Sequence, residues 1–291
     1  MTQRRQFIQS AVACAAAAMA PAAFSQTAAW PSKPINYLVA FPAGGTTDIL
    51  ARVVSQKLGT ALGTTLVIEN KGGAGGSVGS EIAARAAADG YNLLGGTISS
   101  HAINVSLYPK LGYDPIKSFT PVYLYGTNPV VLVVAANSPY KTLKDLLTAA
   151  KANPGKLSGA SAGNGTSQHL AQELLAFKAG VKFTHVPYKG SAPAIQDVMS
   201  GQVDFMFDTT VVAGAHIQSG KLRALAVTSA KRLSDSLPDV STVAESGWPG
   251  TQGFEVVSWQ ALFAPAGTPK PIVDKLHAEI LKIIQTPEMQ E

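Results

Sequence analysis

The sequence predicts an α/β fold, because short apolar segments of strand length alternate with longer segments of helical periodicity. The strand-like segments are residues 35–41, 66–70, 91–97, 130–135, 203–208 and 222–228. Residues 130–135 form the most β-branched run of the chain and are predicted to be a central strand. Apolar residues recur at helical spacing over 49–62 and 141–152. At three places a loop of small residues joins a predicted strand to a predicted helix. This arrangement is typical of α/β folds, in which helices cover the faces of a sheet.

Length and composition favour a well-packed protein over a disordered or nucleic-acid-binding one. The 291 residues suffice for one large domain or two medium ones, and only 14% of them are charged. The formal net charge is +5, but no dense Lys/Arg stripe with interleaved aromatic residues is present. We therefore expect no nucleic-acid partner.

The N-terminus predicts an export signal over residues 1–25. Arg4 and Arg5 precede an Ala-rich run over 7–20, and residues 23–25 form a small-x-small cleavage site. The two arginines also resemble a twin-arginine signal, so the export route stays open. Cys14 is the only cysteine and lies within this segment. A lipid anchor there is the minor interpretation. Cleavage would leave a periplasmic mature chain without thiols, and no later apolar run reaches the ~18 residues of a membrane helix.

The first strand–loop–helix unit predicts an anion-binding loop. Two glycines let the backbone approach a ligand, and the following helix start favours a negatively charged group, most plausibly a carboxylate. The alternative is a tight turn without a ligand. A nucleotide phosphate loop is a poor match, because the loop has no Gly-Lys-Ser/Thr ending and no Gly-x-Gly-x-x-Gly pattern. The candidate contacts in this loop are Phe41, Ala43, Gly44, Gly45, Thr46, Thr47 and Asp48.

Two later units repeat this design, and polar residues follow two further strands. The carboxyl ends of strands in an open α/β sheet are where ligands bind. Opposing loops could hold the two ends of one ligand. The candidate ligand contacts from these segments are Thr97, Ser99, His101, Ala162, Asn164, Gly165, Thr166, Ser167, His169, Tyr188, Ser191, Ala192, Asp208 and Thr209.

The sequence favours binding over catalysis. None of the histidines and aspartates in these loops lies in a hydrolase, metalloprotease or redox motif. His169 and Glu173 are four residues apart and could share a metal, but a helix-surface pair is the better interpretation without a third ligand. We therefore expect no catalytic residue, no metal and no cofactor.

Several motifs, taken together, resemble the Bug family of periplasmic solute-binding receptors, the binding components of tripartite tricarboxylate transporters. The first is Phe41-Pro42-Ala43-Gly44-Gly45-Thr46-Thr47-Asp48 with its preceding strand. The others, in family order, are residues 69–76, 153–157, 163–170, 185–190, 201–204 and 220–228. The resemblance extends from about residue 30 to residue 268.

The resemblance implies a two-domain periplasmic-binding-protein fold, type II-like (Venus flytrap), with two crossover strands. We place the crossovers near residues 125–130 and 227–231. Domain 1 would then comprise residues 30–127 and 229–291, and domain 2 residues 128–228. In the family, backbone N–H groups and ordered waters hold a ligand carboxylate, and the loops named above contain no arginine, which agrees with this mode.

Two features depart from the family pattern. Ala40 stands where members often have proline, and the chain stops at Glu291, soon after a predicted helix over 271–285, where members usually continue. Either the chain is truncated or this domain is short.

Three hypotheses follow for function. The first is a monomeric receptor that captures a small organic acid and delivers it to the membrane subunits of a tripartite tricarboxylate-type transporter. The second is a ligand-sensing receptor that acts on a membrane sensor kinase. The third is an exported hydrolase that depends on His169 or Asp208.

Overall fold

The computed structural model describes residues 30–290, and it confirms the α/β class. The predicted signal peptide, with Arg4, Arg5 and Cys14, lies outside the described residues. Among the described helices, none is long and apolar enough to cross a membrane.

One group of strands forms the first lobe. It contains β1 (Ile35–Val39), β2 (Leu66–Asn70), β3 (Asn92–Thr97), β9 (Val257–Pro265) and the first part of β4 (Phe119–Ala135). β1 pairs in parallel with β2 and β3, whereas β9 runs antiparallel to β3 and β4. The helical elements of this lobe are α2 (Thr46–Leu62), η1 (Ala74–Gly76), α3 (Ser77–Ala84), η2 (Ser99–Ile103), α4 (Asn104–Leu107), α9 (Lys270–Ile284) and α10 (Pro287–Gln290).

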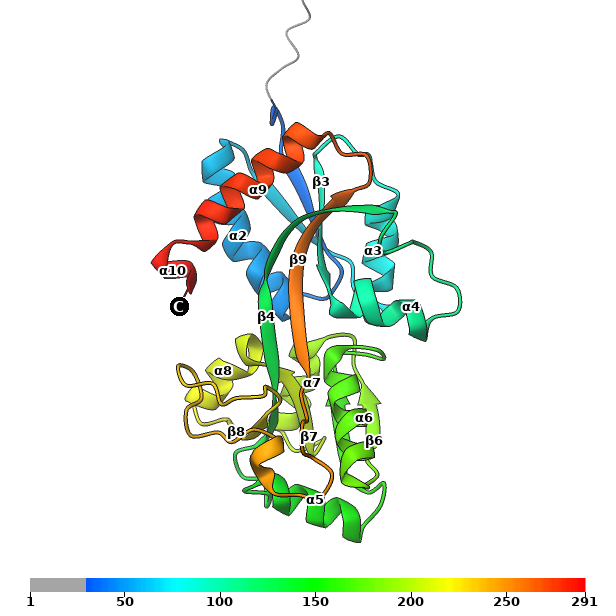
Figure 1. The fold of residues 1–291 in the computed structure, drawn as a ribbon, viewed down its shortest axis with the longest axis vertical. Coiled ribbons are helices and arrows are strands. Elements are labelled where there is room, and N and C mark those ends of the chain that lie inside the picture. Colours follow the sequence, from blue (N-terminus) through cyan, green and yellow to red (C-terminus); the bar gives the residue numbers. More distant parts are fainter. Residues whose placement is uncertain (1–29, 291) are drawn as a thin grey trace, which may run out of the picture. The chain divides into compact units, whose positions relative to one another are not determined.

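The second lobe is built on the last part of β4. There β4 pairs antiparallel with β7 (Phe205–Thr209) and β8 (Leu222–Val227), and β5 (Ser158–Ser161) pairs in parallel with β6 (Thr184–Pro187) and β7. Its helical elements are α5 (Leu143–Ala152), α6 (Ser167–Ala179), α7 (Ser191–Met199), α8 (Thr210–Gln218) and η3 (Ala244–Ser246). Figure 1 shows β4 and β9 running side by side between the two lobes.

The packing of the last part of β4, residues 130–135, explains its continuous apolar sequence. Val130, Leu132 and Val134 pack into one hydrophobic cluster, while Val131 and Val133 pack into another on the opposite face. A strand buried on both faces needs apolar side chains at every position. The prediction of a central strand at residues 130–135 is therefore confirmed.

The segment between β8 and β9 packs with the second lobe. Val243 and Phe254 are buried in the same cluster as Val130, and the amide of Val256 donates to the carbonyl of Thr228. The chain therefore stays with the second lobe until β9 begins. We propose that the second crossover is β9 itself, later in the chain than the expected break at residues 227–231.

Candidate functional site

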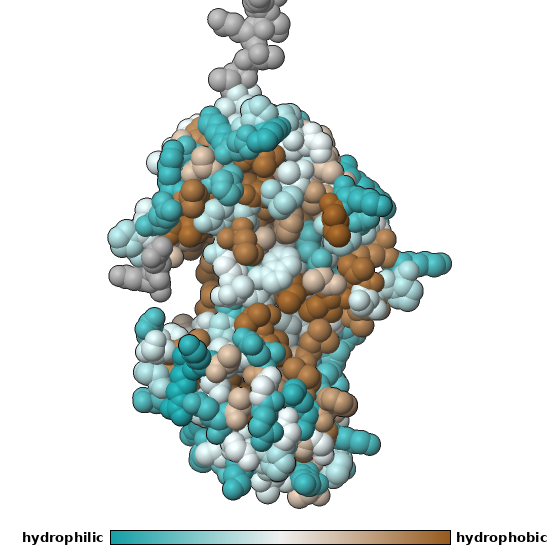
Figure 2. Space-filling view, viewed as in Figure 1, coloured by the Kyte–Doolittle hydropathy of each residue, from teal (hydrophilic) through white to brown (hydrophobic). Residues whose placement is uncertain are grey.

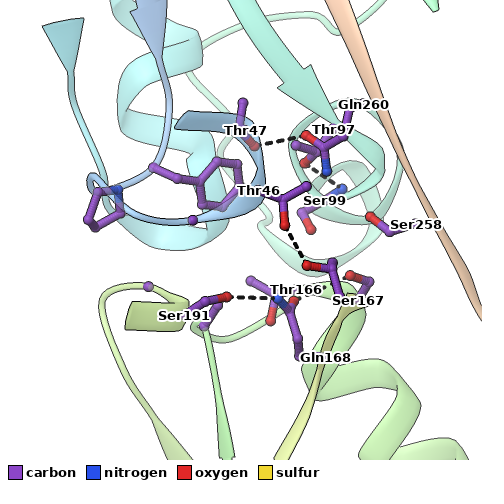
Figure 3. Close-up of a pocket in the computed structure, with 16 residues that line it drawn as sticks. Thr46, Thr47, Thr97, Ser99, Thr166, Ser167, Gln168, Ser191, Ser258 and Gln260 are labelled. Atoms are coloured by element: carbon purple, nitrogen blue, oxygen red, sulfur yellow. Dashed lines mark hydrogen bonds between the residues drawn. The ribbon is translucent and has the colours of Figure 1, made fainter. Parts of the chain in front are cut away.

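A small cavity of about 40 Å³ lies between the two lobes. Figure 3 shows polar side chains converging on it, with Thr46, Thr47 and Ser99 from one lobe and Thr166 and Ser191 from the other. The complete wall is Phe41, Pro42, Gly45, Thr46, Thr47, Thr97, Ser99, Ala162, Thr166, Ser167, Gln168, Gly190, Ser191, Thr209, Ser258 and Gln260.

Four helices, α2, α6, α7 and α8, begin at this wall. Three of them, α2, α7 and α8, start after Gly45, Gly190 and Thr209, none of which caps its helix with a side-chain hydrogen bond. The first amides of a helix have no partner within it, and the helix dipole places partial positive charge there. An anion is the group that such convergent amides bind best.

The wall is polar but carries no charged side chain. Thr47 Oγ1 donates to Gln260 Oε1 at 2.8 Å, and Gln168 Nε2 donates to Ser191 Oγ at 3.3 Å. Across the two lobes, Thr46 Oγ1 and Thr209 Oγ1 form a hydrogen bond of 2.5 Å. The lobes are therefore in direct contact at the cavity. The cavity therefore offers a ligand hydroxyl and amide groups and no ionic clamp.

Asp208 lies directly behind the wall and is completely buried. Its Oδ1 accepts hydrogen bonds from Ser191 Oγ at 2.9 Å, Gln168 Nε2 at 3.2 Å and the amide of Thr209 at 2.8 Å. Its Oδ2 has no partner among the described residues. Burial raises the pKa of Asp208 to about 6, although the three hydrogen bonds oppose this rise. The carboxyl group therefore positions wall residues and does not itself line the cavity.

Asp48 braces the first loop from outside the cavity. One oxygen accepts from the amide of Gly44 at 3.0 Å, the other accepts from Asn70 Nδ2 at 2.9 Å, and Arg52 contacts both. Asn70 Nδ2 also donates to the carbonyl of Phe41. Burial alone would raise the pKa of Asp48, but the hydrogen bonds from Arg52, Gly44 and Asn70 lower it below its usual value. Asp48 thus fixes the shape of the loop from outside the cavity wall.

Replacing Asp48 with asparagine is expected to destabilise the protein by about 1–3 kcal/mol, because a charged acceptor of several buried hydrogen bonds is lost. Ligand affinity should fall as well, because the loop that lines the cavity becomes less ordered. Urea unfolding and calorimetric titration measure the two effects. The matched control is Asp274→Asn, which removes an exposed carboxylate four residues from Lys270 and should cost less than about 0.5 kcal/mol. Equal losses in both variants would contradict the bracing role.

Eleven of the predicted contacts lie in the cavity wall: Phe41, Gly45, Thr46, Thr47, Thr97, Ser99, Ala162, Thr166, Ser167, Ser191 and Thr209. The structure places ten others outside it, namely Ala43, Gly44, Asp48, His101, Asn164, Gly165, His169, Tyr188, Ala192 and Asp208. These ten residues do not line this cavity, and ligand contact by them stays a prediction. Asn164 and Tyr188 instead line a neighbouring chamber.

The rings of the two histidines predicted to contact ligand, His101 and His169, stack on other aromatic rings. The ring of His101 stacks on Phe263 with centroids 4.0 Å apart, and burial lowers its pKa to about 4. The ring of His169 stacks on His185 at 3.9 Å, and His169 Nδ1 accepts from the amide of Gly165. Burial lowers the pKa of His169 also, although the charge of Glu173 opposes this. Both rings therefore support the loops and do not face the cavity.

Five wall residues were not predicted. Pro42, Gln168 and Gly190 lie within the predicted loops, next to residues that were chosen. Ser258 and Gln260 belong to β9, which returns to the first sheet after the whole second lobe. No local motif marks them, so only the strand pairing of β9 with β3 and β4 identifies their position.

Neither His169 nor Asp208, the residues of the hydrolase hypothesis, lines the cavity, and a nearby serine–histidine pair does not line it either. Ser161 Oγ forms a 2.7 Å hydrogen bond with His185 Nε2, but Ser161 is completely buried and neither residue lines the wall. Within residues 30–290, no cluster of three His, Cys, Asp or Glu side chains could hold a metal ion.

Comparison with known proteins identifies a family for the chain. Residues 50–291 match the family described as tripartite tricarboxylate transporter family receptor. A Pseudomonas protein (strain P51), described as a UPF0065 protein in the tcbD-tcbE intergenic region, is 45% identical over 265 residues, covering 90% of this chain and 77% of that protein.

Two solved structures share the whole architecture. The periplasmic binding protein BugD has 42% identity and a TM-score of 0.84, covering 90% of this chain and 86% of its own. Rpa4515 of R. palustris, solved with adipate, has 36% identity and a TM-score of 0.85, covering 89% and 86%. The two-domain binding-protein fold expected from the sequence is thereby confirmed.

Proposed function

Since the chain belongs to the family of tripartite tricarboxylate transporter receptors, we propose that it captures a small organic acid between its lobes and delivers it to the membrane subunits of such a transporter. The observation that carries the proposal is the convergence of four helix N-termini on one uncharged cavity between the lobes. The adipate bound to the related Rpa4515 supports an acid as ligand.

Hydrogen bonds from the helix N-termini and wall hydroxyl groups would suffice to hold an organic acid, and no covalent step is needed. A carboxylate in the cavity would accept hydrogen bonds from first-turn amides and from hydroxyl groups such as Thr46 and Ser191. Convergent helix dipoles stabilise an anion, and closure of the lobes removes competing water, which strengthens each interaction. Release requires only that the lobes separate, breaking contacts such as that of Thr46 with Thr209. We therefore propose a periplasmic receptor with no catalytic activity.

Proline at Ser167 tests whether a helix amide binds the ligand. Ser167 is the first residue of α6, where proline is tolerated; the change removes the amide donor together with the serine hydroxyl group. The preceding Thr166 has an extended backbone, with φ −75° and ψ 159°, which is compatible with a following proline. Ser167→Pro is expected to weaken carboxylate binding about tenfold with an unchanged melting temperature in the absence of ligand.

The control for this variant is Ser167→Ala, which removes the hydroxyl group and keeps the amide. Ser167→Ala should weaken binding less than about fivefold, compared with about tenfold for Ser167→Pro. Isothermal titration calorimetry with a carboxylate found by thermal-shift screening measures both. Equal affinities for the two variants would rule out this amide as a ligand contact.

A further inference from the structure

Two histidines of the second lobe stack on each other beside the loop over residues 163–166. His169 is the third residue of α6 and His185 belongs to β6, and their ring centroids lie 3.9 Å apart with the planes inclined by 16°. Both residues are only partly buried, so a proton can reach them from solvent. Neither lines the cavity, which makes the pair a titratable cluster outside the proposed binding site.

Each ring is connected to the loop by hydrogen bonds. His169 Nδ1 accepts from the amide of Gly165 at 3.2 Å. His185 Nε2 forms a 2.7 Å hydrogen bond with Ser161 Oγ, which also accepts from the amide of Gly163 at 3.1 Å. A ring nitrogen that accepts a hydrogen bond carries no proton, so His169 is neutral in this arrangement. The conformation of the loop therefore depends on an unprotonated Nδ1 of His169.

The loop takes part in the contact between the lobes. A Cβ at Gly75 of the first lobe would lie 2.8 Å from the carbonyl oxygen of Asn164, and a Cβ at Gly165 would overlap the side chain of Leu107. The loop leads directly into α6, whose first two residues line the cavity. A change in the loop would therefore alter both the cavity wall and the surface on which the lobes meet.

The surroundings of the two rings disfavour a positive charge. Burial lowers the pKa of His169 below its ordinary value of 6.5, although the carboxylate of Glu173, 3.7 Å from Nε2, opposes this. Burial and the neighbouring ring lower the pKa of His185 to about 4. His169 also lies in the first turn of α6, where the helix dipole is positive. Protonation of His169 therefore works against the arrangement that the structure shows.

Few other charges lie close to the pair. Among the described residues, the groups that act electrostatically on it are Glu173 and the two rings themselves. β5, β6 and α4 contribute no further charged residue. In Figure 2 the teal side chains gather toward the outer ends of the lobes, while the region where the lobes meet is mostly pale or brown. The remaining titratable groups on neighbouring segments are Asp208, which accepts from Gln168, Tyr188, which donates to Asp197, and the exposed Lys189.

We propose that this histidine pair makes the capture of an organic acid pH-dependent, because a proton on His169 Nδ1 removes the acceptor of the Gly165 amide and releases the loop over residues 163–166. The inference rests on the proposed function and adds its regulation. His169 acts as a positioning residue, through the loop and without touching the acid. A receptor of this kind binds its acid in neutral surroundings and holds it less tightly in acidic ones.

His169→Asn separates the acceptor from the proton, since an asparagine oxygen can take the place of Nδ1 and accepts at every pH. Calorimetric titration at pH 7.5 and pH 5.5 uses succinate, malate, glutarate and adipate as probes. A released ring with the ordinary pKa of 6.5 favours the open loop by up to about tenfold at pH 5.5. We expect the affinity of the original chain to fall about three- to tenfold more than that of His169→Asn. Protonation of the acids and of Asp208 is common to both proteins and cancels.

The control is His216→Asn, which removes a histidine of the same lobe, on α8, outside the cavity wall. It should show the pH dependence of the original chain. An equal loss of affinity in His169→Asn and the original chain would overturn the inference and leave the proposed function standing.

A second measurement needs no ligand. The ¹H–¹⁵N NMR signals of residues 163–166 in the ligand-free original chain should shift between pH 7.5 and pH 5.5, and those of His169→Asn should shift less. Unchanged loop signals in the original chain would show that the pair does not control the loop. If no acid binds at either pH, the proposed function is wrong and its regulation with it, whereas the loop signals still decide whether the pair holds the loop.

Discussion

Replacing Gly75 with alanine is expected to weaken ligand binding about 10- to 100-fold, because the added methyl group would obstruct closure of the lobes. A Cβ at Gly75 would lie 2.8 Å from the carbonyl oxygen of Asn164, on the opposite lobe. Real Cβ contacts are longer, and a backbone carbonyl cannot turn away as a side chain can. Forcing such a contact typically costs 1–3 kcal/mol, which lowers the population of the closed state accordingly.

The backbone of Gly75 requires a matched control, since its φ of +60° also disfavours alanine. Gly201 has a φ of +76°, and a Cβ there would meet nothing within 4 Å. Gly201→Ala should therefore lose a similar stability, about 1 kcal/mol, with unchanged ligand affinity. Titration calorimetry and thermal unfolding separate the two effects. Unchanged affinity in Gly75→Ala would mean that the lobes do not approach each other there when ligand binds.

Replacing Asp208 with asparagine is expected to stabilise the ligand-free protein by about 1–3 kcal/mol at pH 7.5. The pKa of Asp208 is about 6 in the folded protein and 3.8 in the reference state, and each pKa unit corresponds to about 1.4 kcal/mol. Asparagine can keep an oxygen acceptor for Ser191, Gln168 and Thr209 without carrying a buried charge. Denaturant unfolding at fixed pH measures the change.

The stability gained by Asp208→Asn should depend on pH, because the pKa of Asp208 differs between the folded and unfolded chain. Between about pH 4 and 6 the unfolded chain loses the Asp208 proton before the folded chain does, so this group lowers stability as the pH rises. The advantage of Asp208→Asn should therefore disappear near pH 4 and be complete above pH 6. His101 and His185 act in the opposite direction, because burial lowers the pKa of each to about 4, but they are common to both proteins and cancel in the comparison. A destabilised Asp208→Asn at pH 7.5 would show that the ionised carboxylate is needed.

The strand–loop–helix units were predictable because their signals are local. An apolar run, a small-residue loop and a helix start lie within a few residues of each other, and this placed residues such as Thr46, Ser167 and Ser191 at the cavity. Each loop follows directly from the strand that positions it.

Other features depend on partners distant in the chain. Gln260 reaches the wall because β9 pairs between β3 and β4, and His101 is held away by stacking on Phe263. Similarly, residues 229–256 were expected in the first domain, but Phe254 is buried with Val130 in the second lobe. None of these long-range pairings has a local sequence signal, so only the folded chain reveals them.

The proposed site would bind acids without a basic side chain in the cavity wall. Helix amides supply the positive potential, and the wall hydroxyl groups set orientation. A cavity of this kind should distinguish a carboxylate from a neutral group of the same shape, since the amide NH₂ of a carboxamide cannot accept hydrogen bonds from the helix N–H groups.

The most direct measurement is therefore a comparison of acids with their amides. The chain is titrated calorimetrically with an organic acid found by thermal-shift screening and with the corresponding carboxamide, under the same buffer and salt. We expect at least 100-fold weaker binding of the carboxamide, because it has lost the negative charge and one acceptor oxygen. Equal affinity for acid and amide, or binding of the amide alone, would contradict an anion-binding site built from helix N-termini.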